Sequence, residues 1–224
     1  MSIRFKIALP FLLLTLVVSV IGVYVVTRLV TGSLTERLTN QLLEAGRVVS
    51  DRFIRQEEEH VEGALRIVYT VGLSEAVSTE DKESVLRIVE PAFGSGTVEN
   101  MILVSAQGNE VLHLLRGEDG GIVIVEQDTG ASNSPIVAPF FESRNPDDPP
   151  RRSLGSNLVN NELYYYTSLP VAVDGKFSGV IIVGTSIKTL LPEFKRISLA
   201  DVVLYSPDGQ ALAATLGSED EETL

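Results

Sequence analysis

Few side chains in the sequence could carry catalysis or hold a metal. There are two histidines, His60 and His113, and no cysteine. Glu57 and His60 form an E-x-x-H spacing, which places both on one face of a helix. A di-metal site would need a second such motif and further carboxylates on facing helices, and the chain offers no such helix pair. We therefore expect no metal, no cofactor and no enzymatic activity, any catalytic output domain lying beyond residue 224.

Side chains suited to ligand recognition lie on two predicted strands. In "EVLHLLR", alternation puts Val111, His113 and Leu115 on one face and Leu112, Leu114 and Arg116 on the other. Both sets are mostly apolar, so this strand is expected to be buried on both sides. Arg116 could clamp a ligand carboxylate with two hydrogen bonds, or be an ordinary surface arginine.

Aromatic side chains on the second strand could form a pocket wall. In "YYYT", Tyr164 and Tyr166 share a face and Tyr165 points the other way. Their rings and hydroxyls suit a small amphipathic ligand, and they suit core packing equally well. Arg152, next to Arg151, either covers the pocket or balances Asp147 and Asp148. The candidate ligand-binding residues are therefore Arg116, Tyr164, Tyr166, His113 and Arg152.

Charge excludes one class of partner. The net charge is −12, and the first 30 residues hold only three charged side chains, Arg4, Lys6 and Arg28. All 30 acidic side chains therefore lie in the remainder of the chain. A surface this acidic repels phosphate backbones, so nucleic acid is not an expected partner.

An uncharged segment near the N-terminus predicts a membrane anchor. Residues 7–26, "IALPFLLLTLVVSVIGVYVV", would form a helix of about 30 Å, the thickness of the hydrocarbon layer. A cleaved signal peptide is the alternative, but the apolar run is longer than usual and no A-x-A-like site follows. We expect residues 1–6 to be cytoplasmic, 7–30 to span the cell membrane once, and the domain that follows to be extracytoplasmic, although positive charges flank both sides.

An apolar stripe predicts a long helix after the anchor. From Leu34 to Val71 it recurs in steps of 4, 4 and 3 residues, which suits a long α-helix better than a heptad coil. Gly32-Ser33 marks a predicted joint, with Ser33 as N-cap and Glu36 as its capping-box partner. Gln56 and His60 break the stripe, either as a wetter patch or as contacts to a ligand or a dimer mate.

The rest of the sequence predicts a β-sheet with flanking helices. A second helix is expected from Thr79 to Val89, stopping before Pro91. About five strands follow, interrupted by the polar passage "FESRNPDDPPRRSLGSN", and Asp174-Gly175 is a strong hairpin signal. A helix over 188–197 closes the unit. The predicted fold class is α+β, with the membrane helix continuing into a stalk helix packed on an antiparallel sheet.

One hairpin pattern occurs twice. "ILVSAQGNEVL" at 102–112 aligns without gaps with "VLYSPDGQALA" at 203–213, an offset of 101 residues. Turns reuse Gly and Asx residues, so chance is one explanation, but the spacing favours a tandem unit. We expect residues 31–198 to form one domain and 199–224 to begin a second copy that is incomplete in this chain.

Together these features resemble the double Cache family, extracytoplasmic PAS-like sensor domains of bacterial transmembrane receptors. The resemblance rests on the anchor, the stalk, "LPVAVDGKFSGVIIVGTSI" and the second start "VVLYSPDGQALA". It implies a small-ligand sensor of chemoreceptor, histidine kinase or cyclase type, which binds ligand in the membrane-distal unit and forms a homodimer through the stalk. The aromatic, arginine and tryptophan cluster of the amino-acid-binding subtype is not matched, since the chain has no tryptophan, so the ligand class stays open. A membrane-tethered interaction or scaffold domain without a ligand is the alternative, and an ectoenzyme is a further one.

Overall fold

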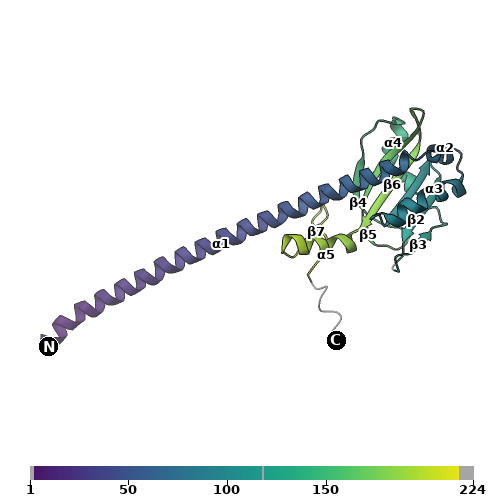
Figure 1. Ribbon diagram of the computed structural model, residues 1–224. Helices are drawn as coiled ribbons and strands as arrows, with labels where there is room; N and C mark the ends of the chain where they lie inside the picture. The colour runs from purple at the N-terminus through teal and green to yellow at the C-terminus, as the bar shows by residue number, and fades with distance from the viewer. Residues whose placement is uncertain (1–2, 118, 217–224) are drawn as a thin grey trace. The chain divides into compact units, whose positions relative to one another are not determined.

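The computed structural model describes residues 3–117 and 119–216, apart from the side chains of 3–11, 29 and 32–35. The chain divides into two compact units, Met1–Val48 and Val49–Leu224. The first unit holds the N-terminal part of helix α1, and the second holds the end of that helix and all other elements (Figure 1). The helices are α1 (Ile3–Val68), α2 (Leu73–Ser78), α3 (Lys82–Ser95), the 3-10 helix η1 (Ala131–Asn133), α4 (Ala138–Ser143) and α5 (Ile187–Ser198).

Helix α1 confirms the long helix predicted from the apolar stripe. It ends at Val68, near the predicted end, but it passes through Gly32 and Ser33 without interruption. The predicted joint is therefore wrong. A glycine or serine inside a helix lowers the stability of the helix by at most about 1 kcal/mol relative to alanine. This is too little to end a helix that continues on both sides of the two residues.

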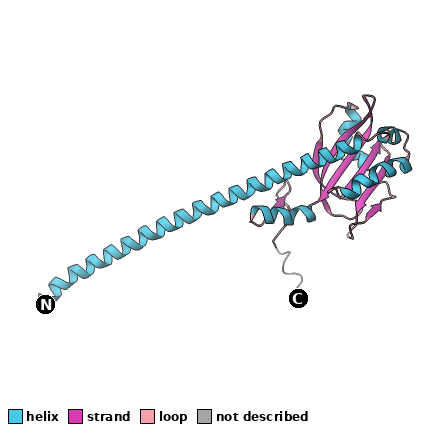
Figure 2. Ribbon diagram, viewed as in Figure 1, coloured by secondary structure: helices cyan, strands magenta, loops and turns pink. Residues whose placement is uncertain are grey.

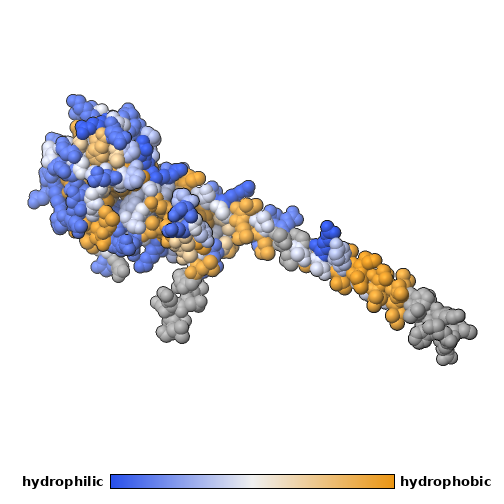
Figure 3. Space-filling view, turned by 180° about the vertical axis from the view of Figure 1, so that it is seen from behind, coloured by the Kyte–Doolittle hydropathy of each residue, from blue (hydrophilic) through white to orange (hydrophobic). Residues whose placement is uncertain are grey.

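The N-terminal part of α1 carries exposed apolar side chains. From Leu12 to Val26 the large apolar residues are between 42% and 68% exposed, and Figure 3 shows them as an orange segment of the helix. Among the described residues, no helix is both long and apolar enough to cross a membrane. The side chains of residues 7–11 fall outside this description, and the anchor stays a prediction.

The second predicted helix, Thr79 to Val89, corresponds to α3, and the short helix α2 before it was not predicted. α3 begins after Asp81, whose carboxylate accepts a hydrogen bond from the backbone N–H of Ser84 and caps the helix. It continues through Pro91 to Ser95, so the predicted stop before the proline is wrong. Val89 and Phe93 on either side of Pro91 are almost fully buried, and this packing offsets the lost backbone hydrogen bond.

The large sheet, which Figure 2 draws in magenta, is antiparallel throughout. Its strand order is β3-β2-β1-β6-β5-β4. Its strands are β1 (Asn100–Ser105), β2 (Glu110–Arg116), β3 (Ile122–Ile124), β4 (Arg151–Ser156), β5 (Leu163–Val173) and β6 (Lys176–Ser186). The hairpin at Asp174-Gly175 is confirmed, and both residues have positive φ (48° and 75°), as a type I′ turn requires.

One strand was missed in the polar passage. Residues 151–156 form β4, which pairs with β5 in a register that places Arg152 opposite Thr167. β4 is an edge strand, with only one neighbour, so arginine and serine side chains can stay in water there. Its sequence therefore lacks the apolar alternation by which strands are recognised.

The two faces of the sheet have separate cores. On one face, Leu103, Leu114 and Ile181 pack with the end of α1, with α2 and with α3. On the other face, Ile102, Val180 and Ile182 pack with Ile136 and with Phe140 of α4. The end of α1 and the helix α4 thus lie on opposite faces, and the second face is the one that contains a cavity.

The terminal hairpin repeats the geometry of the first one. β7 (Val203–Tyr205) and β8 (Ala211–Ala214) form a separate two-stranded sheet. In both hairpins the turn serine donates its N–H to the carbonyl four residues on, and the turn glycine has φ near 90° (Gly108 92°, Gly209 85°). The register also shifts at equivalent positions, 103/104 and 204/205. The assignment of 199–224 to a second domain stays a prediction, and 217–224 lie outside the described residues.

Candidate ligand cavity

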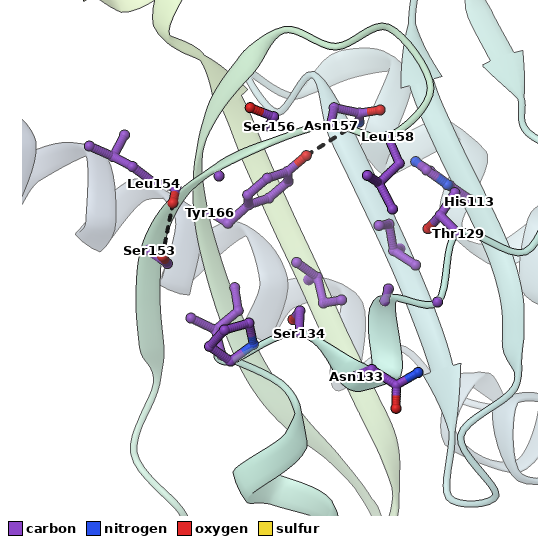
Figure 4. Close-up of a pocket in the computed structure, with 17 residues that line it drawn as sticks. His113, Thr129, Asn133, Ser134, Ser153, Leu154, Ser156, Asn157, Leu158 and Tyr166 are labelled. Atoms are coloured by element: carbon purple, nitrogen blue, oxygen red, sulfur yellow. Dashed lines mark hydrogen bonds between the residues drawn. The ribbon is translucent and has the colours of Figure 1, made fainter. Parts of the chain in front are cut away.

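A cavity of about 380 Å³ lies on the sheet face that carries η1 and α4 (Figure 4). Ile102, His113, Tyr166 and Ile182 form its floor from four neighbouring strands. Residues 129–136 and 153–158 form the walls. This volume is typical of small-molecule sites.

The described residues that line the cavity are apolar or polar, and none carries a fixed charge. The apolar ones include the isoleucines of the floor, Leu154 and Leu158, and the polar ones are serine, threonine, asparagine, tyrosine and histidine side chains. Most of the surface can therefore hold a hydrocarbon body, while a few polar groups orient it.

Tyr166 offers a hydrogen-bond donor at one side of the cavity. Its hydroxyl oxygen accepts hydrogen bonds from the side-chain amides of Asn157 (3.2 Å) and Asn100 (3.0 Å). Burial raises the pKa of the phenol, so the hydroxyl keeps its proton at neutral pH. Because the oxygen already accepts twice, the proton is free to be donated. Gly184, opposite Tyr166 in the sheet, makes room for the ring.

His113 and Glu110 form a buried pair at another side. Their side chains are only 2% and 4% exposed, and the Nδ1 of His113 lies 3.9 Å from Oε2 of Glu110. Burial lowers the pKa of His113 to about 4, so the ring is neutral at neutral pH. Neither ring nitrogen of His113 has a hydrogen-bond partner among the described residues, and the same is true of Oε2 of Glu110.

A β-bulge brings these two residues to the same face. Strand β2 pairs Leu112 with Leu103 and Glu110 with Val104, which leaves Val111 as an extra residue. Simple alternation would have put Glu110 and His113 on opposite faces, and it put Val111 on the face of His113. Instead Val111 packs in the core beneath the helices, and the predicted placement of Val111 is wrong.

Glu110 also holds one wall of the cavity in place. Its other oxygen, Oε1, accepts from the backbone N–H and the hydroxyl of Thr129 (3.0 and 2.7 Å) and from the N–H of Ala131 (2.8 Å). Neither Glu110 nor the segment 129–136 was predicted from the sequence. The available signal was an acidic residue at the start of an otherwise apolar strand, at E-x-x-H spacing from His113.

The structure brings His113 and Tyr166, two of the five predicted residues, to the cavity. Arg116 instead donates to the carbonyls of Phe93, Gly96 and Val98 and lies 5.4 Å from the Phe93 ring centroid. Tyr164 stacks on Tyr166 behind the lining, and Arg152 pairs with Glu57 of α1. These three residues do not line the cavity.

A second polar cluster lies on the opposite face of the sheet. His60 of α1 is fully buried, and its ring nitrogens contact Thr167 Oγ1 (3.1 Å), Thr185 Oγ1 (2.9 Å) and Gln56 Nε2 (3.0 Å). Burial is the larger cause, and the positive charge of Arg52 the smaller one, that lowers the pKa of His60 to about 4. Gln56 and His60 therefore form neither a wetter patch nor a surface contact, but a buried joint between α1 and strands β5 and β6.

No cluster of three or more histidine or acidic side chains in the described part of the chain could hold a metal ion. The E-x-x-H residues of α1 have other partners, since Glu57 pairs with Arg152 and His60 bonds to the sheet.

Most of the chain matches a known protein family. The family model for the double sensory domain of two-component sensor kinase, dCache_3, matches residues 35–219. The chain belongs to this double Cache family. As a double Cache domain it is a sensory domain, as the sequence resemblance predicted. Among curated proteins, none matches the chain.

Solved structures share the double Cache fold at low sequence identity. The ligand-binding domain of the Campylobacter jejuni chemoreceptor Tlp3, in complex with L-valine, is 13% identical with a TM-score of 0.61, over 83% of this chain and 73% of that one. A structure named methyl-accepting chemotaxis protein X is 14% identical with a TM-score of 0.59, and the match covers 80% of this chain and 74% of that one. The extracellular domain of a protein described as a histidine kinase, vpHK1S-Z8, is 13% identical with a TM-score of 0.54, and the match covers 77% of this chain and 63% of that one.

Proposed function

We propose that this double Cache chain is an extracytoplasmic sensor that binds a small molecule in the cavity on the β2–β1–β6–β5 floor. The observation that carries this proposal is the cavity itself, about 380 Å³ in volume, with apolar walls and a few polar groups from the floor and rim. Amino acids are the first compounds to test, because the Tlp3 domain of similar fold was crystallised with L-valine.

The cavity has a short connection to helix α1. Tyr166 lines the cavity, and the next residue, Thr167, points to the other face and bonds to His60. A ligand that favours one position of β5 would therefore favour one arrangement of the His60 cluster and of α1. We propose that α1 carries this change toward the membrane, and that output comes from a receptor domain of chemoreceptor, kinase or cyclase type rather than from catalysis by these residues.

We further propose that residues 7–26 anchor the chain in the cell membrane, with the N-terminus in the cytoplasm. The exposed apolar side chains from Leu12 to Val26 support this, since in water they would be costly. Alkaline carbonate extraction of membranes would test it. Release of the full chain into the soluble fraction would contradict the anchor.

The binding proposal is tested by thermal unfolding of the detergent-solubilised full chain against a library of metabolites. A ligand of the folded state must raise the midpoint. Ala131→Leu, which places a larger side chain at a lining position of the cavity, should abolish the rise, and Ala214→Leu, at an exposed position of β8, should leave it unchanged. If no compound shifts the midpoint, or if Ala131→Leu retains every shift, the ligand-free interaction domain becomes the better description.

A further inference from the structure

One side of the cavity contains buried polar atoms that lack partners. Among the described residues these are both ring nitrogens of His113 and Oε2 of Glu110. A buried polar atom without a partner is unfavourable, because it has lost its hydrogen bonds to water. His113 lines the cavity and Glu110 does not, so a ligand there could provide a partner for the His113 ring. The cavity thus contains a built recognition site on its His113 side.

The charge around the site is negative. No arginine or lysine is found among the described lining residues. The guanidinium of Arg151 lies over the Phe140 ring, 5.5 Å from its centroid, and Arg151 is not a lining residue. The carboxylate of Glu110 stands directly behind His113. A ligand carboxylate would be buried here without a cation and beside a like charge, which is costly.

The hydrogen-bonding pattern points to a ligand that donates. Nδ1 lies 3.9 Å from the Glu110 carboxylate, and this negative charge favours the neutral His113 tautomer with its proton on Nδ1. In that tautomer Nε2 is an acceptor. In Figure 4 the His113 ring lies at the edge of the cavity beside Thr129 and near Leu158. A donor group bound to Nε2 would thus have apolar surface next to it.

We propose that the ligand is a small amine with an apolar body and no carboxylate. Its ammonium group donates to His113 Nε2, and the Glu110 carboxylate behind the ring compensates its charge. The apolar body lies against Ile102, Ile182 and Leu158. If the ligand has an acceptor atom, the Tyr166 hydroxyl donates a hydrogen bond to it. This inference rests on the proposed function, because it names the ligand class of the same cavity.

The test compares amines with amino acids that have the same side chain. Isobutylamine and L-valine form one pair, and phenethylamine and L-phenylalanine form another. Calorimetric titration of the detergent-solubilised full chain should give at least tenfold tighter binding for the amine of a pair. Ala131→Leu should abolish this binding, which separates the cavity from general attraction of amines to an acidic surface.

Two variants test the role of Glu110. Glu110→Gln keeps an oxygen for Thr129 and Ala131 but removes the charge, and it should weaken amine binding at least tenfold. Glu126→Gln removes an exposed carboxylate that pairs with Lys82, and it should change binding less than twofold. If Glu110→Gln does not unfold cooperatively, His113→Phe replaces it, and the same loss is expected.

The outcomes separate this inference from the proposed function. If amino acids bind as tightly as the matched amines or more tightly, or if Glu110→Gln and His113→Phe leave amine binding intact, the ligand class is wrong while the cavity remains a ligand site. If neither compound of any pair binds, the ligand class is also wrong. The metabolite screen and Ala131→Leu then decide separately whether the cavity binds anything.

Discussion

At the scale of single residues, Gly184 determines how Tyr166 fits against the sheet. A methyl group at Gly184 would come within 2.6 Å of Cδ1 of Tyr166, a rigid ring atom. Gly184→Ala should therefore lower the free energy of unfolding by about 1–3 kcal/mol, as overpacking typically does. Urea denaturation would measure this change.

Gly155→Ala is the matched control for Gly184→Ala. Gly155 lies on the other side of the same ring, but its added methyl would be 3.7 Å from Cδ2, an ordinary contact. We expect its free energy of unfolding to change by less than about 0.5 kcal/mol. Equal effects of the two substitutions would mean that the ring is not confined by Gly184.

The buried histidines predict a pH dependence of stability. His60 and His113 have pKa values of about 4 in the folded chain, against an ordinary value of 6.5. Between pH 6.5 and 4 the unfolded chain therefore binds more protons, so stability falls as the pH falls through this window and is insensitive to these groups above it.

His60→Gln isolates the contribution of His60. The substitution removes one titrating group, so the loss of stability between pH 6.5 and 5 should become shallower by up to about 1.4 kcal/mol per pH unit. Arg52 and the stacked ring of Tyr165 remain in place, and carboxylates titrate alike in both proteins. Parallel curves from urea denaturation would contradict a neutral, buried His60.

At the scale of elements, Arg116 ties the end of α3 to the sheet. Its guanidinium donates to Phe93 O (2.8 Å), Gly96 O (3.1 Å) and Val98 O (3.4 Å). Arg116→Met keeps much of the side-chain length but loses these bonds. It should lower the free energy of unfolding by about 1–3 kcal/mol and leave ligand affinity unchanged.

Arg66→Met serves as the control for Arg116→Met. Arg66 forms an exposed pair with Glu62 (3.8 Å), which should contribute less than about 1 kcal/mol. Denaturation and titration of both variants separate the two roles of Arg116. A loss of affinity at unchanged stability would restore the ligand clamp predicted from sequence.

At the scale of the whole molecule, the stalk predicts a homodimer. Leu38 and Leu42 are 58% and 68% exposed, and their spacing of four residues puts them on one side of α1. The chain has no cysteine, so Leu42→Cys introduces a single thiol. We expect disulfide-linked dimers under mild oxidation, measured on non-reducing gels.

Glu44→Cys is the control for this cross-link, since two residues along a helix point to nearly opposite sides. It should form far fewer dimers than Leu42→Cys. Equal yields at both positions would indicate random collision, and absence of dimers at both would contradict pairing through this part of α1.

The features that depend on neighbouring residues could be predicted from the sequence. The apolar period gives α1, because a helix repeats every 3.6 residues whatever lies beside it. Asp174-Gly175 and the paired turns at Gly108 and Gly209 give the hairpins, because each turn needs backbone angles that few residue types adopt. The α+β class and the family resemblance follow from these local signals.

The features that depend on contacts between distant residues became clear from the three-dimensional fold. β1 lies between β2 and β6, and β4 is recognised as a strand only through its pairing with β5. Arg116 forms hydrogen bonds at the end of helix α3 because carbonyl groups of residues 93–98 lie within reach of its guanidinium. Glu110 shares a face with His113 only because β2 has a bulge. The energy of such contacts comes from burial and from hydrogen bonds between segments far apart in the chain, which local residue patterns do not encode.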